Sequence, residues 1–155
     1  QVLGVYDREL VRIAAEVLGQ LGSEHVMVVH SEDGLDEISI NARTHVAELK
    51  DGAVREYDLA PEDFGLSRSS LEALRVDDPA QSLDLVRASL SGSHQGASDI
   101  VALNAGAAIY VSGQALSLEA GVEMAKDAIS AGLATEKMKD FADFTQQISA
   151  AETDG

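Results

Sequence analysis

The sequence contains no cysteine and no tryptophan, only two prolines, and few aromatic side chains of any kind. The absence of cysteine excludes a disulfide framework and a thiolate metal site. Three Tyr and three Phe give little material for a stacking platform that would bind bases or sugars. The chain has no apolar run of the roughly 20 residues that a membrane span needs. It also has no basic, apolar leader. We therefore expect a cytoplasmic protein without a membrane partner.

Basic residues are scarce as well. Eleven Lys and Arg stand against 27 Asp and Glu, which gives a formal net charge of −16. Such a charge repels nucleic acid and anionic membranes, so neither is an expected partner. It also repels phosphorylated small molecules, so a substrate of that kind would need metal ions or basic residues from outside this chain. With 155 residues, 45% of them hydrophobic, the chain is long enough for one domain with a real core.

Hydrophobic periodicity predicts an α/β fold that begins with a strand, a helix and a second strand. The helix is amphipathic, with Asp7 as its N-cap and Gly22 as its terminator. A βαβ unit of this length makes its two strands parallel. Asp51-Gly52 lies between two strand-like runs and predicts a β-hairpin. The expected strands cover residues 1–6, 25–30, 44–50 and 53–59, and the first helix covers residues 7–21.

The second half of the chain reads as a run of helices. Pro79 suits the first helical position after Asp78, and Ser117 caps a later helix. Small residues at 105–108 would allow close packing against a neighbouring helix. The expected helices cover residues 79–90, 99–112, 117–132 and 134–148, after a single helical turn at 60–65. Two parallel strands and a hairpin make a thin sheet, so we expect residues 1–150 to be part of a larger α/β domain and residues 151–155 to be a frayed tail.

The most informative segment is SEDGLDEIS, residues 31–39, which follows the apolar run VMVVH and is called the acidic turn below. In open α/β sheets, ligands bind outside the carboxyl ends of the strands. Mg²⁺ takes carboxylate oxygens there, often together with substrate phosphates. Asp36 and Glu37 are therefore candidate metal ligands. The alternative is a solvated acidic loop. Asp33 could join the metal, but we favour a role in shaping the Asp-Gly turn.

Three other features have both a structural and a functional interpretation. His30, at a strand end near the acidic turn, could orient a ligand, but we favour a structural role. Asn104 lies on an apolar helix face, and we interpret it as a hydrogen-bonding residue rather than a substrate contact. Met138, Phe141 and Phe144 are either core or docking surface. No side chain is a convincing nucleophile or general base, so no catalytic or substrate-binding residue is assigned.

Five segments, in this order, resemble the C-terminal half of the anthranilate phosphoribosyltransferase family, within the nucleoside phosphorylase class of phosphoribosyltransferases. They are QVLGVY, VVHSEDGLDEIS, VAELKDG, EYDLAPEDFGL and DIVALNAGAAIYVSG, and they fall within residues 1–140. The resemblance implies the C-terminal portion of a nucleoside-phosphorylase-type α/β domain. It also implies an enzyme of tryptophan biosynthesis that transfers phosphoribosyl from phosphoribosyl pyrophosphate to the anthranilate nitrogen and releases pyrophosphate. In such an enzyme Asp36 and Glu37 would bind Mg²⁺ at the pyrophosphate.

The resemblance also implies which parts of the family this chain lacks. The glycine-rich GTGGD loop, the KHGN segment and the arginine that meets the anthranilate carboxylate precede the position that matches Gln1. We therefore expect the isolated chain to be inactive, and the intact enzyme to be a homodimer formed through its N-terminal region. The glutamine amidotransferase subunit of anthranilate synthase is a further candidate partner. Two other functions stay open, a related phosphorylase or phosphoribosyltransferase acting on another base, and a non-catalytic acidic binding domain.

Overall fold

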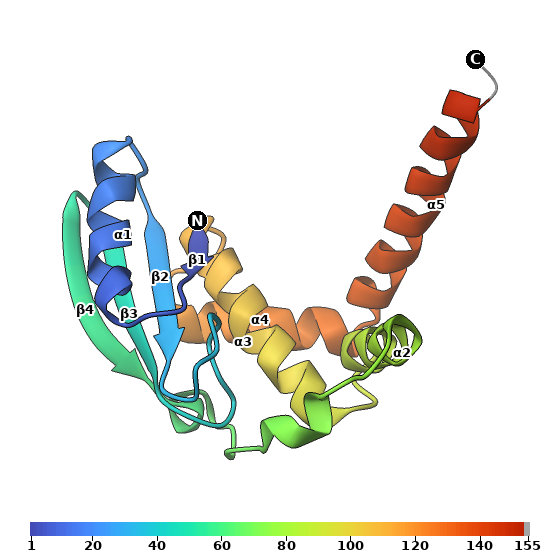
Figure 1. The fold of residues 1–155 in the computed structure, drawn as a ribbon, viewed down its shortest axis with the longest axis horizontal. Helices are drawn as coiled ribbons and strands as arrows, with labels where there is room; N and C mark the ends of the chain where they lie inside the picture. The colour runs from blue at the N-terminus through green and yellow to red at the C-terminus, as the bar shows by residue number, and fades with distance from the viewer. Residues whose placement is uncertain (154–155) are drawn as a thin grey trace.

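In a computed structural model the chain forms a four-stranded sheet with helices packed on it (Figure 1). The structure describes residues 1–153, with side chains for residues 1–148. The strands are β1 (Val2–Gly4), β2 (Val26–Ser31), β3 (Thr44–Lys50) and β4 (Ala53–Leu59), in the spatial order β1-β2-β3-β4. β1 and β2 are parallel, and the other two pairs are antiparallel. The predicted α/β fold, parallel first pair and hairpin are confirmed.

The helices follow the predicted order. They are α1 (Glu9–Gln20), α2 (Pro79–Leu90), α3 (Gln95–Val111), α4 (Leu118–Ser130) and α5 (Leu133–Thr153), with short 3₁₀ turns η1 (Pro61–Phe64) and η2 (Leu71–Leu74). No helix among the described residues is both long and apolar enough to cross a membrane.

Strand β2 is buried on both faces, and its side chains alternate between two cores. Val26 and Val28 pack with α1 on one face of the sheet. Met27 and Val29 pack with α3 and α4 on the other face. A third cluster joins α3 and α4 away from the sheet. The continuous apolar run of β2 is therefore what a strand between two helical layers requires.

Local signals account for several of the turns. Asp51 and Gly52 have φ angles of 51° and 75°, as a type I′ hairpin turn requires. Asp78 and Ser117 each accept a backbone hydrogen bond with their side chains and cap α2 and α4. Gly22, with φ 93°, follows the end of α1. Each of these predictions is confirmed.

Two helix starts differ from the predicted residues by two positions or more. α3 begins at Gln95 rather than at residue 99, because the His94 ring accepts a backbone N–H of the first turn and caps the helix early. α1 begins at Glu9, whose N–H donates to the Asp7 carboxylate at 2.9 Å. Asp7 therefore caps the helix, but from one position further out than an ordinary N-cap.

Small residues bring α3 and α4 into close contact, as the stripe at 105–108 predicts. A Cβ on Gly106 would lie 2.6 Å from the Cα of Val122. A Cβ on Gly121 would overlap the carbonyl oxygen of Gly106. The two backbones can approach this closely only because both positions are glycine.

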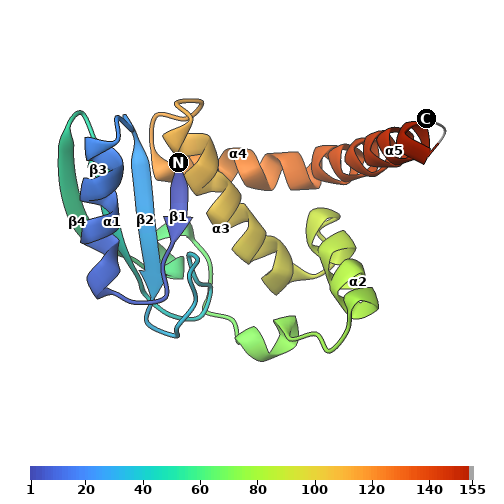
Figure 2. The same ribbon diagram turned by 45° about the horizontal axis from the view of Figure 1, so that its top comes forward.

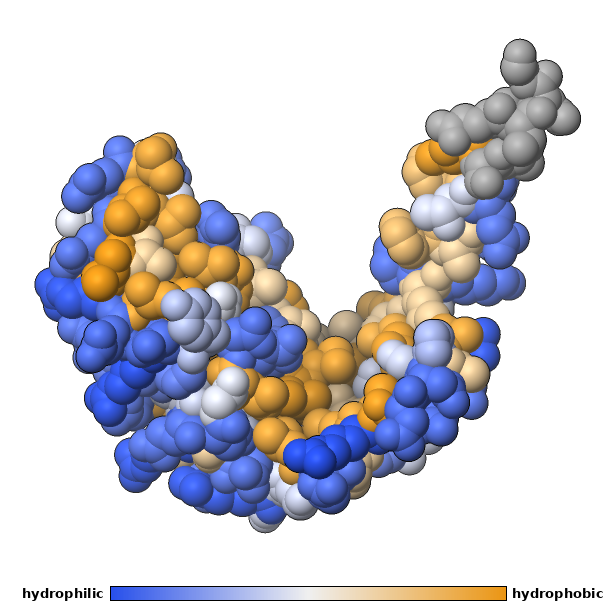
Figure 3. All heavy atoms as spheres, in the orientation of Figure 1, coloured by the Kyte–Doolittle hydropathy of each residue, from blue (hydrophilic) through white to orange (hydrophobic). Residues whose placement is uncertain are grey.

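Helix α5 projects from the body of the molecule (Figures 1 and 2). Phe141 and Phe144 on this helix are 67% and 61% exposed, so they are not part of the core. Figure 3 shows apolar side chains on the side of α5 that faces the sheet. Their interpretation as a docking surface stays a prediction. So does the fraying of residues 151–155, because α5 continues to Thr153 and residues 154–155 lie outside the described residues.

Candidate metal centre

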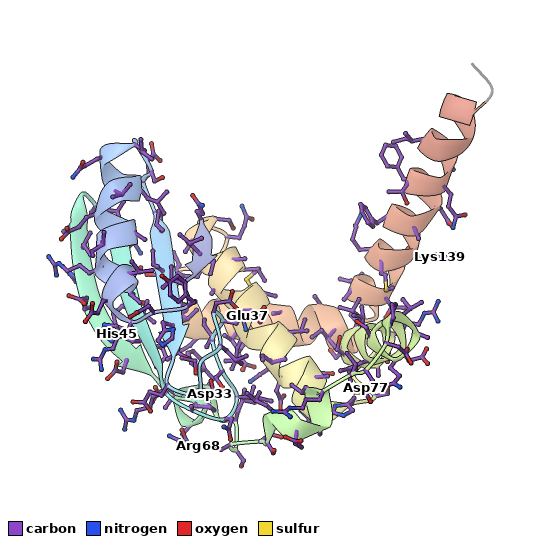
Figure 4. The ribbon with its side chains drawn as sticks, in the orientation of Figure 1. Asp33, Glu37, His45, Arg68, Asp77 and Lys139 are labelled. Carbon is purple, nitrogen blue, oxygen red and sulfur yellow. The ribbon has the colours of Figure 1, made fainter. Side chains whose placement is uncertain are left out.

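The acidic turn leaves the sheet at the carboxyl end of β2. Gly34 has a φ of 89°, which allows the chain to reverse directly after the strand. The N–H of Ser31 donates to the carbonyl of Leu35 at 2.9 Å and closes the turn. Figure 4 shows Glu37 further along the loop than Asp33 and nearer the centre of the molecule. The turn thus carries its later acids away from the strand end and toward α3.

Asp33 is a structural residue of this turn. Its carboxylate accepts hydrogen bonds from the hydroxyls of Ser31 and Ser39 at 2.5 and 2.7 Å, and one from the Asn41 amide at 3.4 Å. Burial works against the charged form, but these hydrogen bonds outweigh it and lower the pKa of Asp33. The favoured interpretation of Asp33 agrees with this geometry, because both of its oxygens are already engaged.

Asp36 and Glu37, called the acidic pair below, are in the opposite situation. Both are exposed, and within the described residues neither carboxylate accepts a hydrogen bond or forms an ion pair. Although its surface is exposed, nearby protein atoms partly desolvate the Glu37 carboxylate, and this desolvation and the negative charge of Asp36 raise its pKa. A bound cation would relieve the repulsion between the two carboxylates. The structure therefore leaves both candidate ligands available.

The donor set of the acidic pair fits Mg²⁺ bound together with a substrate. In the described part of the chain, no three His, Asp or Glu side chains gather closely enough to hold a metal by themselves. Mg²⁺ is usually held by one or two carboxylates and by substrate phosphates, and it retains several waters. Two free carboxylates at the edge of a sheet are thus suited to a metal that arrives with a phosphorylated ligand.

Asn104 and Gly4 hold the acidic turn from two sides. Asn104 of α3 accepts a hydrogen bond from the N–H of Ile38 at 2.9 Å and donates to its carbonyl at 3.0 Å. Gly4 ends β1 where a Cβ would overlap the carbonyl oxygen of Asp36. Asn104 is therefore the hydrogen-bonding residue that was predicted, although it is half-buried and its partner is the turn itself.

His30 also has the structural role that we favoured, because its Nδ1 donates to the carbonyl of Val5 at 2.9 Å. This bond ties the segment after β1 to β2. Gly4 was missed by the sequence reasoning, although a glycine in a strand is a known sign of a close backbone approach. The glycine in the predicted strand was this sign, but the sequence does not indicate that the approaching segment is the acidic turn.

A family profile described as "Glycosyl transferase family, a/b domain" matches residues 1–135, and the chain belongs to this family. Within it, the chain is 58% identical over 153 residues to the anthranilate phosphoribosyltransferase of Cellvibrio japonicus. The aligned region covers 96% of this chain and 44% of the relative. The resemblance predicted from five sequence segments is thereby confirmed. The chain spans less than half the length of the curated relatives that it matches.

Solved structures agree with the sequence relatives. Anthranilate phosphoribosyltransferase from Thermus thermophilus is 35% identical with a TM-score of 0.83, covering 92% of this chain and 42% of that one. A variant of the enzyme from Saccharomyces cerevisiae, solved with Mg bound, is 25% identical with a TM-score of 0.78, over 92% of this chain and 42% of that one. The predicted fold is thus confirmed by its similarity to these solved structures.

Proposed function

We propose that this chain is the C-terminal part of an anthranilate phosphoribosyltransferase, a cytoplasmic pentosyltransferase of tryptophan biosynthesis. The amino nitrogen of anthranilate would form a bond to the anomeric carbon of phosphoribosyl pyrophosphate, and the bond from that carbon to pyrophosphate would break. The observation that carries the proposal is the acidic pair, held at the edge of the sheet without any protein partner among the described residues, in a chain 58% identical to a relative of that name.

Asp36 and Glu37 are the residues that would hold Mg²⁺. When bound, this ion neutralises the negative charge that develops on the leaving pyrophosphate, without a proton transfer. The acidic pair concentrates negative charge on a loop that α3 and β1 keep in place, so the ligands are arranged before the substrate binds. The raised pKa of Glu37 makes this carboxylate take up a proton at a higher pH than an ordinary Glu, so metal binding should weaken as the pH falls.

The rest of the active site would come from outside this sequence. The net charge of −16 repels a polyanionic substrate. The resemblance implies that a glycine-rich phosphate cradle and an acceptor site lie in the part of the relatives that this chain does not span. On this basis the isolated chain should be inactive. A homodimer formed by the N-terminal region, and association with the amidotransferase subunit of anthranilate synthase, are further proposals that rest on the same resemblance.

The test is the loss of anthranilate fluorescence when phosphoribosyl pyrophosphate and Mg²⁺ are added to the full-length protein that contains this sequence. The double variant Asp36→Asn/Glu37→Gln removes both charges at constant size. We expect it to lose about 100-fold or more of kcat/KM. Glu32→Gln, which removes an exposed charge from the same turn, is the matched control and should stay within about twofold of wild type.

The outcomes separate the reaction from the site. If the wild type is active and the double variant retains that activity, the proposed reaction is supported and the assignment of Asp36 and Glu37 as metal ligands is wrong. A wild-type protein that does not consume anthranilate would instead favour the alternative of a related enzyme acting on another base.

A further inference from the structure

We propose that Asn104 is a positioning residue for the metal, holding the acidic pair in place from α3 while Gly4 closes the opposite side. This inference rests on the proposed metal site at Asp36 and Glu37. In this proposal Asn104 acts on the acidic pair only through the backbone of Ile38, the residue next to Glu37.

The Asn104 amide is used almost completely. Its Oδ1 accepts from the N–H of Ile38, and its Nδ2 donates to the carbonyls of Ile38 and Ile100 at 3.0 Å each. The bond to Ile100, in the preceding turn of α3, fixes the side-chain rotamer. Ile38 directly follows Glu37, so both backbone polar groups of the residue beside the carboxylate are held by a rigid helix.

Gly4 limits the turn from the side of the sheet. A Cβ on this residue would overlap the carbonyl oxygen of Asp36 and would lie 3.0 Å from the Cβ of Asp36. The end of β1 therefore lies directly against the backbone of the first ligand. Glu37 therefore lies between two restrained neighbours. Gly4 packs against Asp36 on one side, and Asn104 forms two hydrogen bonds with Ile38 on the other. These contacts oppose movement of the loop relative to α3 and β1.

Such restraint matters because two adjacent carboxylates repel each other, and a free loop would let them turn apart. The hydrogen bonds of Asn104 oppose that rotation before any cation is present. Groups that orient a metal ligand through a second contact commonly change metal affinity 10- to 100-fold when they are removed. Asn104 meets this description, since its whole hydrogen-bonding capacity toward other elements is directed at the acidic turn.

The experiment compares Asn104→Ala with Ser98→Ala in the full-length protein. The hydroxyl of Ser98, on the same helix, donates to the carbonyls of Ser89 at 2.8 Å and His94 at 3.1 Å, remote in sequence from the acidic turn. Ser98→Ala therefore removes buried hydrogen bonds of α3 without touching the metal ligands. The probe is Mn²⁺ with inorganic pyrophosphate, and its binding is measured as the loss of the free Mn²⁺ signal in electron paramagnetic resonance.

We expect Asn104→Ala to weaken Mn²⁺ binding by about tenfold. Ser98→Ala should stay within about twofold of wild type, while its melting temperature falls by a similar amount to that of Asn104→Ala. In the activity assay, Asn104→Ala should need a correspondingly higher Mg²⁺ concentration and should recover its kcat at saturating Mg²⁺. A residue that only stabilises the fold would change the melting temperature without this recovery.

Unchanged Mn²⁺ affinity in Asn104→Ala, beside clear binding by wild type, would overturn the positioning role and leave the proposed metal site standing. Wild-type protein that binds no Mn²⁺ with pyrophosphate, or binds it equally after Asp36→Asn/Glu37→Gln, would remove the site and this inference with it. If Asn104→Ala does not fold, Asn104→Leu keeps the approximate size without adding a charge and removes both hydrogen bonds with Ile38. It should show the same loss of affinity.

Discussion

Carboxylates at the two ends of β2 have opposite surroundings. Near the amino end, Glu48 of β3 accepts hydrogen bonds from His25 at 2.9 Å, Tyr57 at 2.9 Å and Tyr110 at 2.8 Å, an arrangement called the Glu48 network below. Beyond the carboxyl end, the acidic pair accepts none among the described residues. One end of the strand therefore holds a carboxylate saturated with donors, and the other end holds two to which no described residue donates.

The difference is visible in the direction of the pKa shifts. Burial opposes ionisation in both places. Hydrogen bonds from His25 and the two tyrosines nevertheless lower the pKa of Glu48, whereas burial and a negative neighbour raise the pKa of Glu37. The donors around a carboxylate therefore decide its role. A saturated carboxylate joins elements of the fold, and an unsaturated one remains available to a cation.

The largest expected effect comes from removing the saturated carboxylate. Glu48→Ala leaves three donors without their acceptor, including the half-buried Tyr57, and should lower the free energy of unfolding by about 3 kcal/mol. Urea denaturation of the full-length protein measures this. Glu24→Ala, an exposed acid on the segment before β2, is the control and should be nearly neutral. Mn²⁺ binding should not change, and a Glu48→Ala variant as stable as wild type would contradict the structural role.

A substitution at Gly4 should affect stability and metal binding together, because this residue lies against the acidic turn. The new Cβ of Gly4→Ala must displace the carbonyl of Asp36, at a cost of about 2 kcal/mol. Metal affinity should fall with it. Gly19→Ala is the matched control, since its Cβ would meet only the end of the Leu49 side chain, at 3.2 Å. A stable Gly4→Ala protein with normal Mn²⁺ affinity would show that the turn adapts.

The Glu48 network should also make stability depend on pH in the acid range. The pKa of Glu48 in the folded protein is lower than its ordinary value of 4.5. Its contribution is therefore fully present above that ordinary value and is lost as the pH falls through the folded-state pKa. The stability difference between wild type and Glu48→Gln should shrink by about 1 kcal/mol between roughly pH 5 and pH 3. A difference that stays constant over this range would argue against the charged hydrogen bonds.

The features that could be predicted from sequence are those whose cause lies within a few residues. The Asp51-Gly52 hairpin and the Ser117 cap depend on local backbone preferences, and the position of the acidic turn depends on a buried strand followed by acids. The features that could not be predicted join distant segments. Asn104 meets Ile38 across 66 positions, and Tyr110 meets Glu48 across 62.

Glu48 shows why such contacts are hidden from the sequence. It is one of 27 acidic residues, and nothing near it in the chain indicates that an imidazole and two phenols converge on it. The high content of Asp and Glu makes the acidic pair hard to distinguish from a solvated loop. For the same reason, Glu48 cannot be recognised from the sequence as a carboxylate with three donors. Only the tertiary arrangement, which brings His25, Tyr57 and Tyr110 to one carboxylate, separates the two cases.

The smallest expected effect is a gain in stability at the acidic pair. The raised pKa of Glu37 means that its charged form is disfavoured in the folded protein, so ionisation removes stability as the pH rises through that value. Without divalent cations at neutral pH, Glu37→Gln should therefore raise the melting temperature by about 1 °C. Glu32→Gln should leave it unchanged.

With Mg²⁺ and pyrophosphate present, the order should reverse, because only the wild-type pair gains stability from binding. Differential scanning fluorimetry of the three proteins with and without the ligands measures both differences. A Glu37→Gln variant that melts below wild type in both conditions would show that this carboxylate stabilises the fold as Glu48 does. The distinction between the two ends of β2 would then fail, since both would hold structural acids.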